Sequence, residues 1–322
     1  MVQPIVTRAE LEVARGRVAA HAYHTPLLTS RLLSEESGFD VRFKAEVFQR
    51  GGSFKIRGAL NKFATLSREE KERGAVCSSS GNHAQGFALA ARLYGIRGVV
   101  VMAENATPSK VAATRAYGAE VVLHGQIWDE ANEKALELGE SEGLTYIHPF
   151  DDLALIAGQG TLGMEILEDW PDTDVIVVPI GGGGLIAGVA CAVNALKPTA
   201  RVIGVESSDG PAMKASMDAG HVVTLDQIDT VVDGLRAKRV GELTFAIARE
   251  LVSEVVTVSD RTIFDAVLWT MAHTKLVVEG AAAASVAVVR SGLVDAPKGS
   301  RVVCVLSGGN LDLKQIEGRT WN

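Results

Sequence analysis

Apolar runs rich in β-branched residues alternate with segments of helical pattern along most of this chain, and this alternation limits its fold more than any other feature. The runs lie at residues 75–80, 98–102, 119–125, 174–180, 201–206 and 301–307. Apolar runs of this length are typical of strands buried on both faces of a parallel sheet. The helical segments lie at residues 83–94, 108–117, 128–141, 184–196 and 260–273. Because parallel strands need crossover connections, the pattern predicts an α/β fold.

The length of the chain suggests more than one domain. Its 322 residues, of which 47% are hydrophobic, correspond to two ordinary domains at about 150 residues each. The 33 glycines and the low aromatic content of 5% fit helices packed closely on sheets. No repeat, low-complexity tract or linker separates two halves, so we expect two closely packed domains.

Charge and composition exclude several classes of protein. The net charge is −7 and no cluster of Lys and Arg is present, so nucleic acid is not an expected partner. Residues 175–196 carry no charge, but Pro179 and four glycines interrupt them, which indicates strand, loop and helix instead of a membrane span. No signal pattern precedes residue 10, which predicts a cytoplasmic protein without a membrane partner.

Three widely spaced cysteines, Cys77, Cys191 and Cys304, are expected to be buried and unpaired.

Small and polar residues gather at the ends of three predicted strands: Ser78–His83, Gly181–Gly184 and Ser307–Asn310. Open parallel sheets bind ligands outside the carboxyl ends of their strands. These three segments are therefore the expected walls of a binding site.

The glycine run is the sharpest of the three signals. A strand, four glycines and a helix in succession let backbone N–H groups approach an anion at the positive end of the helix. This predicts a phosphate site at Gly181, Gly182, Gly183 and Gly184. A tight turn is one alternative. A dinucleotide site is another, since Gly182, Gly184 and Ala187 satisfy G-x-G-x-x-G/A and Glu206 ends the next strand.

Lys55 stands in the segment GGSFKIRGA, between a pair of glycines and an expected helix start. A single lysine is usually a solvated surface group, and only desolvation or a fixed partner makes it a nucleophile near neutral pH. The segment SSSGNHAQG at residues 78–86 could hold a carboxylate on its exposed N–H groups, or could simply cap a helix.

Six segments together, in this order, resemble the fold-type-II pyridoxal-phosphate enzymes of the serine/threonine dehydratase and serine racemase group. They are HTPLLTS (24–30), GSFKIRGA (52–59), SSGNHAQG (79–86), AGQGT (157–161), PIGGGGL (179–185) and LSGGN (306–310). The resemblance implies two open, mainly parallel twisted sheets with helices on both faces, and a cofactor, pyridoxal 5′-phosphate, between a large and a small domain. The large domain would comprise residues 1–52 and 148–322, and the small mobile domain residues 53–147.

The resemblance also implies a role for individual residues. Lys55 would bind the cofactor covalently, Phe54 would lie against its ring, and Asn82 would bind the ring hydroxyl. Ser307 would face the pyridine nitrogen, which favours elimination over transamination. The remaining residues implied beside the cofactor are Gly181 to Gly184, Gly234 and Glu279. The substrate carboxylate would be bound by Ser79, Gly81, Asn82 and His83, with Ser80 opposite the lysine as a second catalytic residue.

The reaction implied is dehydration and deamination of a small hydroxy-amino acid, threonine or serine, to a 2-oxo acid and ammonia. Serine racemase and 3-hydroxyaspartate ammonia-lyase are the alternatives within the family, and an NAD-dependent oxidoreductase lies outside it. Ala131 and Ala237 stand where racemases of the mammalian type carry an arginine and a serine that help bind substrate, which favours the dehydratase. Some relatives hold Mg²⁺ or Mn²⁺ beside Glu206, although the second carboxylate of that site is replaced here by Ala212, with Asp209 nearby. A homodimer or homotetramer is expected from the family.

Overall fold

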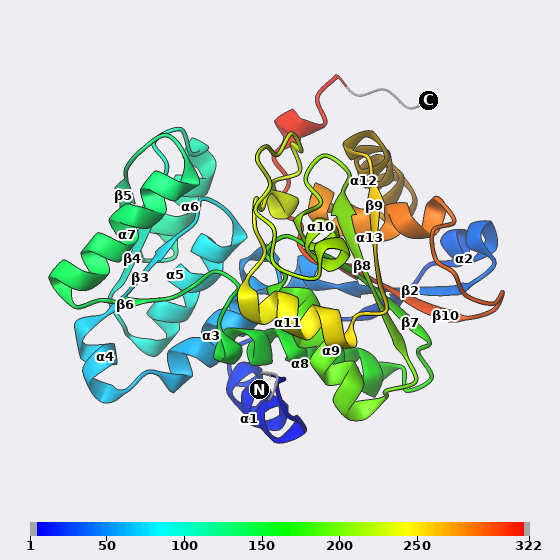
Figure 1. Ribbon diagram of the computed structural model, residues 1–322, viewed down its shortest axis with the longest axis horizontal. Helices are drawn as coiled ribbons and strands as arrows, with labels where there is room; N and C mark the ends of the chain where they lie inside the picture. The colour runs from blue at the N-terminus through cyan, green and yellow to red at the C-terminus, as the bar shows by residue number, and fades with distance from the viewer. Residues whose placement is uncertain (1–4, 319–322) are drawn as a thin grey trace.

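The computed structural model of the chain describes residues 5–318 and contains two sheets, each with helices packed on both faces (Figure 1). This confirms the α/β fold that the alternation predicts and the two mainly parallel sheets that the resemblance implies. The two sheets lie side by side, and helix α3 (Lys55–Thr65) runs between them.

The larger sheet has six strands in the order β1-β2-β10-β7-β8-β9. Only β1 is antiparallel to its neighbour; the other pairs are parallel. The strands are β1 (Leu27–Thr29), β2 (Asp40–Ala45), β7 (Val175–Pro179), β8 (Arg201–Ser207), β9 (Glu254–Val258) and β10 (Arg301–Leu306). Val175 and Val177 pack into one hydrophobic cluster and Ile176 and Val178 into another, on the opposite face. A strand buried on both faces must be apolar at every position, which explains the continuous run at 174–180.

The smaller sheet has four parallel strands in the order β5-β4-β3-β6. They are β3 (Ala75–Ser78), β4 (Gly98–Met102), β5 (Glu120–Leu123) and β6 (Thr145–Tyr146). All four lie between residues 75 and 146, but the limits predicted for a small domain, 53 and 147, stay a prediction.

The helices form layers on both sheets. One face of the larger sheet carries α2 (Arg31–Ser37), α12 (Asp260–Thr274) and α13 (Gly280–Arg290). The other carries α8 (Leu153–Asp169), α9 (Gly184–Leu196), α10 (Ala212–Ala219) and α11 (Glu242–Leu251), with α1 (Arg8–Ala19) outside α8 and α9. The smaller sheet has α3, α5 (Asn82–Tyr94) and α6 (Pro108–Ala116) on one face and α7 (Trp128–Glu142) on the other. Helix α4 (Arg68–Arg73) connects α3 to β3.

Glycines let α8 pack tightly between α3 and α9. A Cβ at Gly158 would lie 2.6 Å from the carbonyl oxygen of Arg57, and one at Gly188 would lie 2.5 Å from the amide nitrogen of Gly160. Neither distance is compatible with a side chain. The segment AGQGT is therefore a helix-packing segment that fixes α3, and with it Lys55, against the larger sheet.

The predicted strands and helices agree with the structure, apart from shifts at their ends. The sequence did not reveal β1, β2, β6 or β9. All three cysteines are buried and free, as predicted. No helix within residues 5–318 is long and apolar enough to cross a membrane; the uncharged stretch 175–196 forms β7, a glycine loop and α9.

Candidate active site

The loop that carries Lys55 is paired with the end of β10. Ser53 forms an antiparallel bridge with Gly308. The amide of Phe54 donates to the carbonyl oxygen of Ser307 at 3.0 Å, and the amide of Gly309 donates to that of Gly52 at 2.9 Å. These bonds place Lys55, the first residue of α3, beside Ser307.

Lys55 is half-buried. Its Nζ donates to the carbonyl oxygen of Pro149 at 3.0 Å and lies 5.3 Å from the centre of the Phe54 ring. Burial lowers the pKa of Lys55 to about 8, although the Glu279 carboxylate nearby opposes this shift. A substantial fraction of the amine is therefore neutral near physiological pH and available as a nucleophile.

Asn82 connects the smaller sheet to the larger one. It begins α5, after the short loop that follows β3, and its Nδ2 donates to both carboxylate oxygens of Glu279, at 2.7 and 2.9 Å. Glu279 precedes α13 on the larger sheet. Burial raises the pKa of Glu279, while the hydrogen bond from Asn82 lowers it.

The loop from β3 to α5 offers unused hydrogen-bond donors. The backbone N–H groups of Ser80, Asn82 and His83 donate to no other described residue, whereas the amide of Gly81 donates to Ser79 Oγ at 3.2 Å. Ser79 and Ser80 are partly exposed. Three free N–H groups at the start of a helix form an arrangement suited to a carboxylate.

The imidazole of His83 is buried beneath this loop. Its two ring nitrogens make no well-formed hydrogen bond within the described part of the chain. Burial lowers the pKa of His83 well below its usual range, and the nearby Lys55 and His148 lower it further. The ring is therefore neutral.

The four glycines between β7 and α9 form a cradle of bare backbone. None of their N–H groups donates to another described residue, and Gly183 has a φ of +96°, which favours glycine. A Cβ would lie 2.5 Å from the carbonyl oxygen of Gly234 if placed at Gly181, 2.2 Å from the ring of Phe150 if placed at Gly182, and 2.7 Å from Thr244 Oγ1 if placed at Gly183. Free N–H groups at the N-terminus of α9 fit a phosphate group.

Two further predicted residues lie next to these walls. Gly234, in the 3₁₀ helix η3 (Asp233–Leu235), contacts Gly181 through its carbonyl oxygen. Ser307 is 2% exposed, and its hydroxyl makes no hydrogen bond with residues 5–318. The structure thus brings the loop of Lys55, Asn82 with Glu279, the glycine cradle and Ser307 into one region.

Residues 148–151, which follow the two-residue strand β6, were mostly missed from the sequence. His148 Nδ1 accepts the amides of Phe150 and Asp151 at 3.2 and 2.7 Å, so this nitrogen is unprotonated. The Asp151 carboxylate accepts three amides at the start of α11. A two-residue strand leaves too short an apolar pattern to be recognised.

Glu206 does not face an open site. Its two carboxylate oxygens accept the amides of Met213 and Lys214, both at 2.8 Å, at the start of α10. Among the described residues, no group of three or more His, Cys, Asp or Glu side chains could hold a metal ion. The cation considered for Glu206 therefore has no support in this structure, and a side chain that is 2% exposed is poorly placed to bind the ribose of a dinucleotide.

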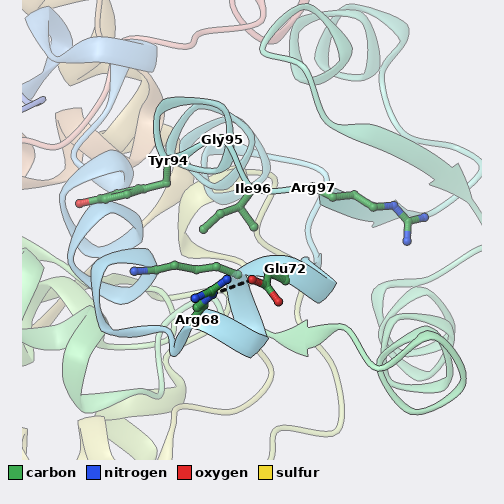
Figure 2. A pocket seen from close by; sticks show the side chains of 7 residues that line it. Arg68, Glu72, Tyr94, Gly95, Ile96 and Arg97 are labelled. Atoms are coloured by element: carbon green, nitrogen blue, oxygen red, sulfur yellow. Dashed lines mark hydrogen bonds and ion pairs between the residues drawn. The ribbon is translucent and has the colours of Figure 1, made fainter.

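A hollow of about 570 Å³ lies elsewhere, between α4 and the turn from α5 to β4, and is lined by three cations, Arg68, Lys71 and Arg97. Figure 2 shows that Arg68 is paired with Glu72 and that the guanidinium of Arg97 points away from both. Arg97 binds Glu120 and Glu142 instead. The two arginines do not converge, so this hollow is not a second candidate for the anion site.

Comparisons with known proteins agree with these features. Residues 18–308 match the family model described as pyridoxal-phosphate dependent enzyme. The chain is 45% identical to L-threonine ammonia-lyase of Thermotoga maritima, over 97% of this chain and 78% of that protein. It is also 45% identical to the catabolic L-threonine dehydratase TdcB of Escherichia coli K12, over 94% of this chain and 92% of that protein. The solved structure of maize serine racemase superposes with a TM-score of 0.92 at 35% identity and covers 97% of this chain and 96% of that one.

The residues present fit the cofactor of this family. A partly neutral lysine amine suits its aldehyde, the glycine N–H groups suit its phosphate, and the unpartnered hydroxyl of Ser307 suits its ring nitrogen. The match to the family model covers most of the chain, and this chain therefore belongs to the pyridoxal-phosphate dependent enzymes.

Proposed function

We propose that this protein is a pyridoxal-phosphate dependent ammonia-lyase that converts L-threonine, L-serine or both into a 2-oxo acid and ammonia. The observation that carries this proposal is the position of the Lys55 loop. Pairing with β10 holds this loop beside Ser307, and burial lowers the pKa of Lys55 to about 8. The threonine dehydratases that share 45% identity with the chain support the choice of substrate.

Lys55 would hold the cofactor covalently, Gly181 to Gly184 would bind its phosphate, and Phe54, Gly234 and Ser307 would enclose its ring. When bound, the cofactor supplies an electron sink for the bond broken at the substrate Cα. A hydroxyl at position 307 is a weaker acid than a carboxylic acid, so it leaves the ring nitrogen largely unprotonated and favours elimination.

The chain supplies the rest of the site. The free amides of Ser80, Asn82 and His83 would bind the substrate carboxylate. The amine of Lys55, released when the substrate amine takes its place, would remove the Cα proton. Ser80 would lie on the side of the substrate opposite Lys55. The β-hydroxyl would leave as water, taking up the equivalent of the proton removed from Cα, and a further water would hydrolyse the released enamine to the 2-oxo acid and ammonia.

Serine racemase remains the second candidate because the fold is shared with the maize enzyme. Two positions favour the lyase. Ala131 is 1% exposed and packs among Val76, Val99 and Val101 beneath the smaller sheet, so it supplies no polar group, and Ala237 supplies none in the loop after η3. Activity toward 3-hydroxyaspartate is an alternative within the same chemistry, and a panel of hydroxy-amino acids separates these substrates.

Borohydride reduction tests the proposal directly. We expect reduction of the protein loaded with pyridoxal phosphate to label Lys55, and the Lys55→Ala variant to lose at least about 1,000-fold in 2-oxo acid release from threonine. Lys134→Ala, which removes a lysine from the surface of α7, is the matched control and should retain full activity. Unlabelled Lys55, or an active Lys55→Ala protein, would refute the proposal.

Cytoplasmic location and a homodimeric or homotetrameric assembly stay predictions. The molecular mass in solution, measured with and without pyridoxal phosphate, tests the assembly.

A further inference from the structure

Asn310 lies just past the end of β10, and its side chain joins two distant segments. Its Nδ2 donates to the carbonyl oxygen of Gly51 at 2.8 Å and to Oδ1 of Asn82 at 2.9 Å. Gly51 belongs to the loop that leads into Lys55, and Asn82 begins α5 on the smaller sheet. One amide therefore ties the Lys55 loop to the smaller sheet.

The direction of both amides follows from these contacts. A peptide carbonyl only accepts hydrogen bonds, so the end of Asn310 that faces Gly51 must be its NH₂ group. The end of Asn82 that faces this NH₂ group must then be its oxygen. The NH₂ group of Asn82 consequently points at Glu279, whose carboxylate oxygens lie 2.7 and 2.9 Å away.

One hydrogen of Asn82 remains free in this arrangement. The two N–H bonds of an amide diverge by about 120°, whereas the two oxygens of one carboxylate lie close together in nearly the same direction. Both oxygens of Glu279 therefore share one N–H bond, and the other N–H bond can be given to a ligand. The oxygen of Asn82 is already engaged by Asn310.

Packing holds Asn310 in place. Gly52 has a φ of +71°, and a Cβ at this position would lie 2.4 Å from Oδ1 of Asn310. The side chain of Asn310 thus lies directly on the backbone of the loop that precedes Lys55.

We infer that Asn310 is a positioning residue: with Glu279 it holds the amide of Asn82 as a hydrogen-bond donor toward the ligand bound at Lys55. This inference rests on the proposed function. The acceptor it fits is the oxygen on the cofactor ring, and a fixed N–H donor favours the deprotonated form of that oxygen. Glu279 is the charged group that faces Asn82 directly, and Lys55, Lys110 and Asp233 act on Glu279 in turn. Substitution of Asn310 leaves all four in place.

Two variants of Asn310 test this role, and Asn310→Ala is the decisive one, because the negative charge that Asn310→Asp adds also raises the pKa of a group beside it. Asn310→Asp keeps the shape but presents an acceptor to Gly51 and to Oδ1 of Asn82, which turns the Asn82 amide. Asn310→Ala removes the tie but leaves Glu279 to hold the amide. Asn105→Asp is the matched control, because Asn105 Nδ2 also donates to a backbone carbonyl, that of Gln126 at 2.9 Å, in an exposed loop.

The readout is the pH at which the visible absorbance of the bound cofactor changes by half. We expect Asn310→Asp to raise this midpoint by about one pH unit or more, Asn310→Ala to raise it by less, and Asn105→Asp to leave it unchanged. An unchanged midpoint in Asn310→Ala, or a larger shift for alanine than for aspartate, would overturn the inference. A parent protein that binds no pyridoxal phosphate would overturn the proposed function, and the inference with it.

Discussion

Lys55 gives the clearest pH dependence at the scale of single residues. Burial lowers the pKa of Lys55 from an ordinary value of 10.5 to about 8, so the neutral, nucleophilic amine decreases about tenfold for each pH unit below 8. We expect the rate of pyridoxal-phosphate uptake by the cofactor-free protein to rise with pH and to level off above about 8. Stopped-flow absorbance measures this rate. A rate that still rises steeply between pH 9 and 10 would contradict the lowered pKa.

Gly182 tests the glycine cradle at the same scale. The first atom of any side chain there would lie 2.2 Å from the ring of Phe150, so we expect Gly182→Ala to weaken pyridoxal-phosphate binding at least about tenfold and to lower the melting temperature. Phe150→Ala in the same chain should restore part of the stability by making room.

Gly16→Ala is the control for Gly182→Ala. Gly16 lies inside helix α1, and a Cβ added there would have no neighbouring atom within 4 Å. This change should stabilise the protein by about 0.5–1 kcal/mol. If the Gly182→Ala protein bound the cofactor as tightly as the parent, the close packing at Gly182 would not be needed for cofactor binding.

The sequence predicts the strand-end loops of the site but not how they meet. Glycines after an apolar run are a local pattern, visible at Gly181–Gly184 and after Ser307. The pairing of Phe54 with Ser307 and the contact between Asn82 and Glu279 join residues far apart in the chain. Such pairings depend on tertiary packing, which no short window of sequence contains, so only the family resemblance placed these residues together.

At the scale of secondary structure elements, a buried charge network fixes the start of α3. Arg57 is fully buried, binds Glu46 and Glu165, and stands two residues after Lys55. Its loss leaves the buried carboxylate of Glu46 without a cation, while Glu165 keeps only Lys44. We therefore expect Arg57→Met to lower the free energy of unfolding by about 3–5 kcal/mol. Chemical denaturation measures this change.

Arg97→Met is the matched control for Arg57, because Arg97 also binds two carboxylates, Glu120 and Glu142, but at the surface. It should lower the free energy of unfolding by less than about 1 kcal/mol. Equal losses for the two arginines would show that burial does not set the strength of these ion pairs.

Elements with long apolar patterns were predictable, and short or edge elements were not. The runs at 98–102 and 184–196 correspond to β4 and α9, whereas β6 has two residues and β1 three. In β2 the charged Lys44 is buried and paired with Glu165. A charge inside a strand hides its apolar pattern, and its burial becomes understandable only when its partner on α8 is known.

At the scale of the whole molecule, an ion pair near the glycine cradle joins a helix of the smaller sheet to the unit that contains the larger sheet. Lys110, on α6, binds Asp233 in η3, and η3 also contacts the glycine cradle through Gly234. We propose that the smaller unit moves toward the larger one when substrate binds and that this pair favours the closed arrangement. The Asp233 side chain is 48% exposed, so the pair should add less than about 1 kcal/mol to stability.

Lys110→Ala should therefore raise the KM for threonine about two- to fivefold, while the melting temperature stays within about 2 °C of the parent. Lys110→Asp combined with Asp233→Lys should restore the KM in part, because attraction between the two units returns with the charges exchanged. High salt should raise the KM of the parent and not that of Lys110→Ala, since exposed charges are screened. Steady-state kinetics at two ionic strengths measures these effects. A KM that is unchanged in Lys110→Ala would show that the two units close without this ion pair.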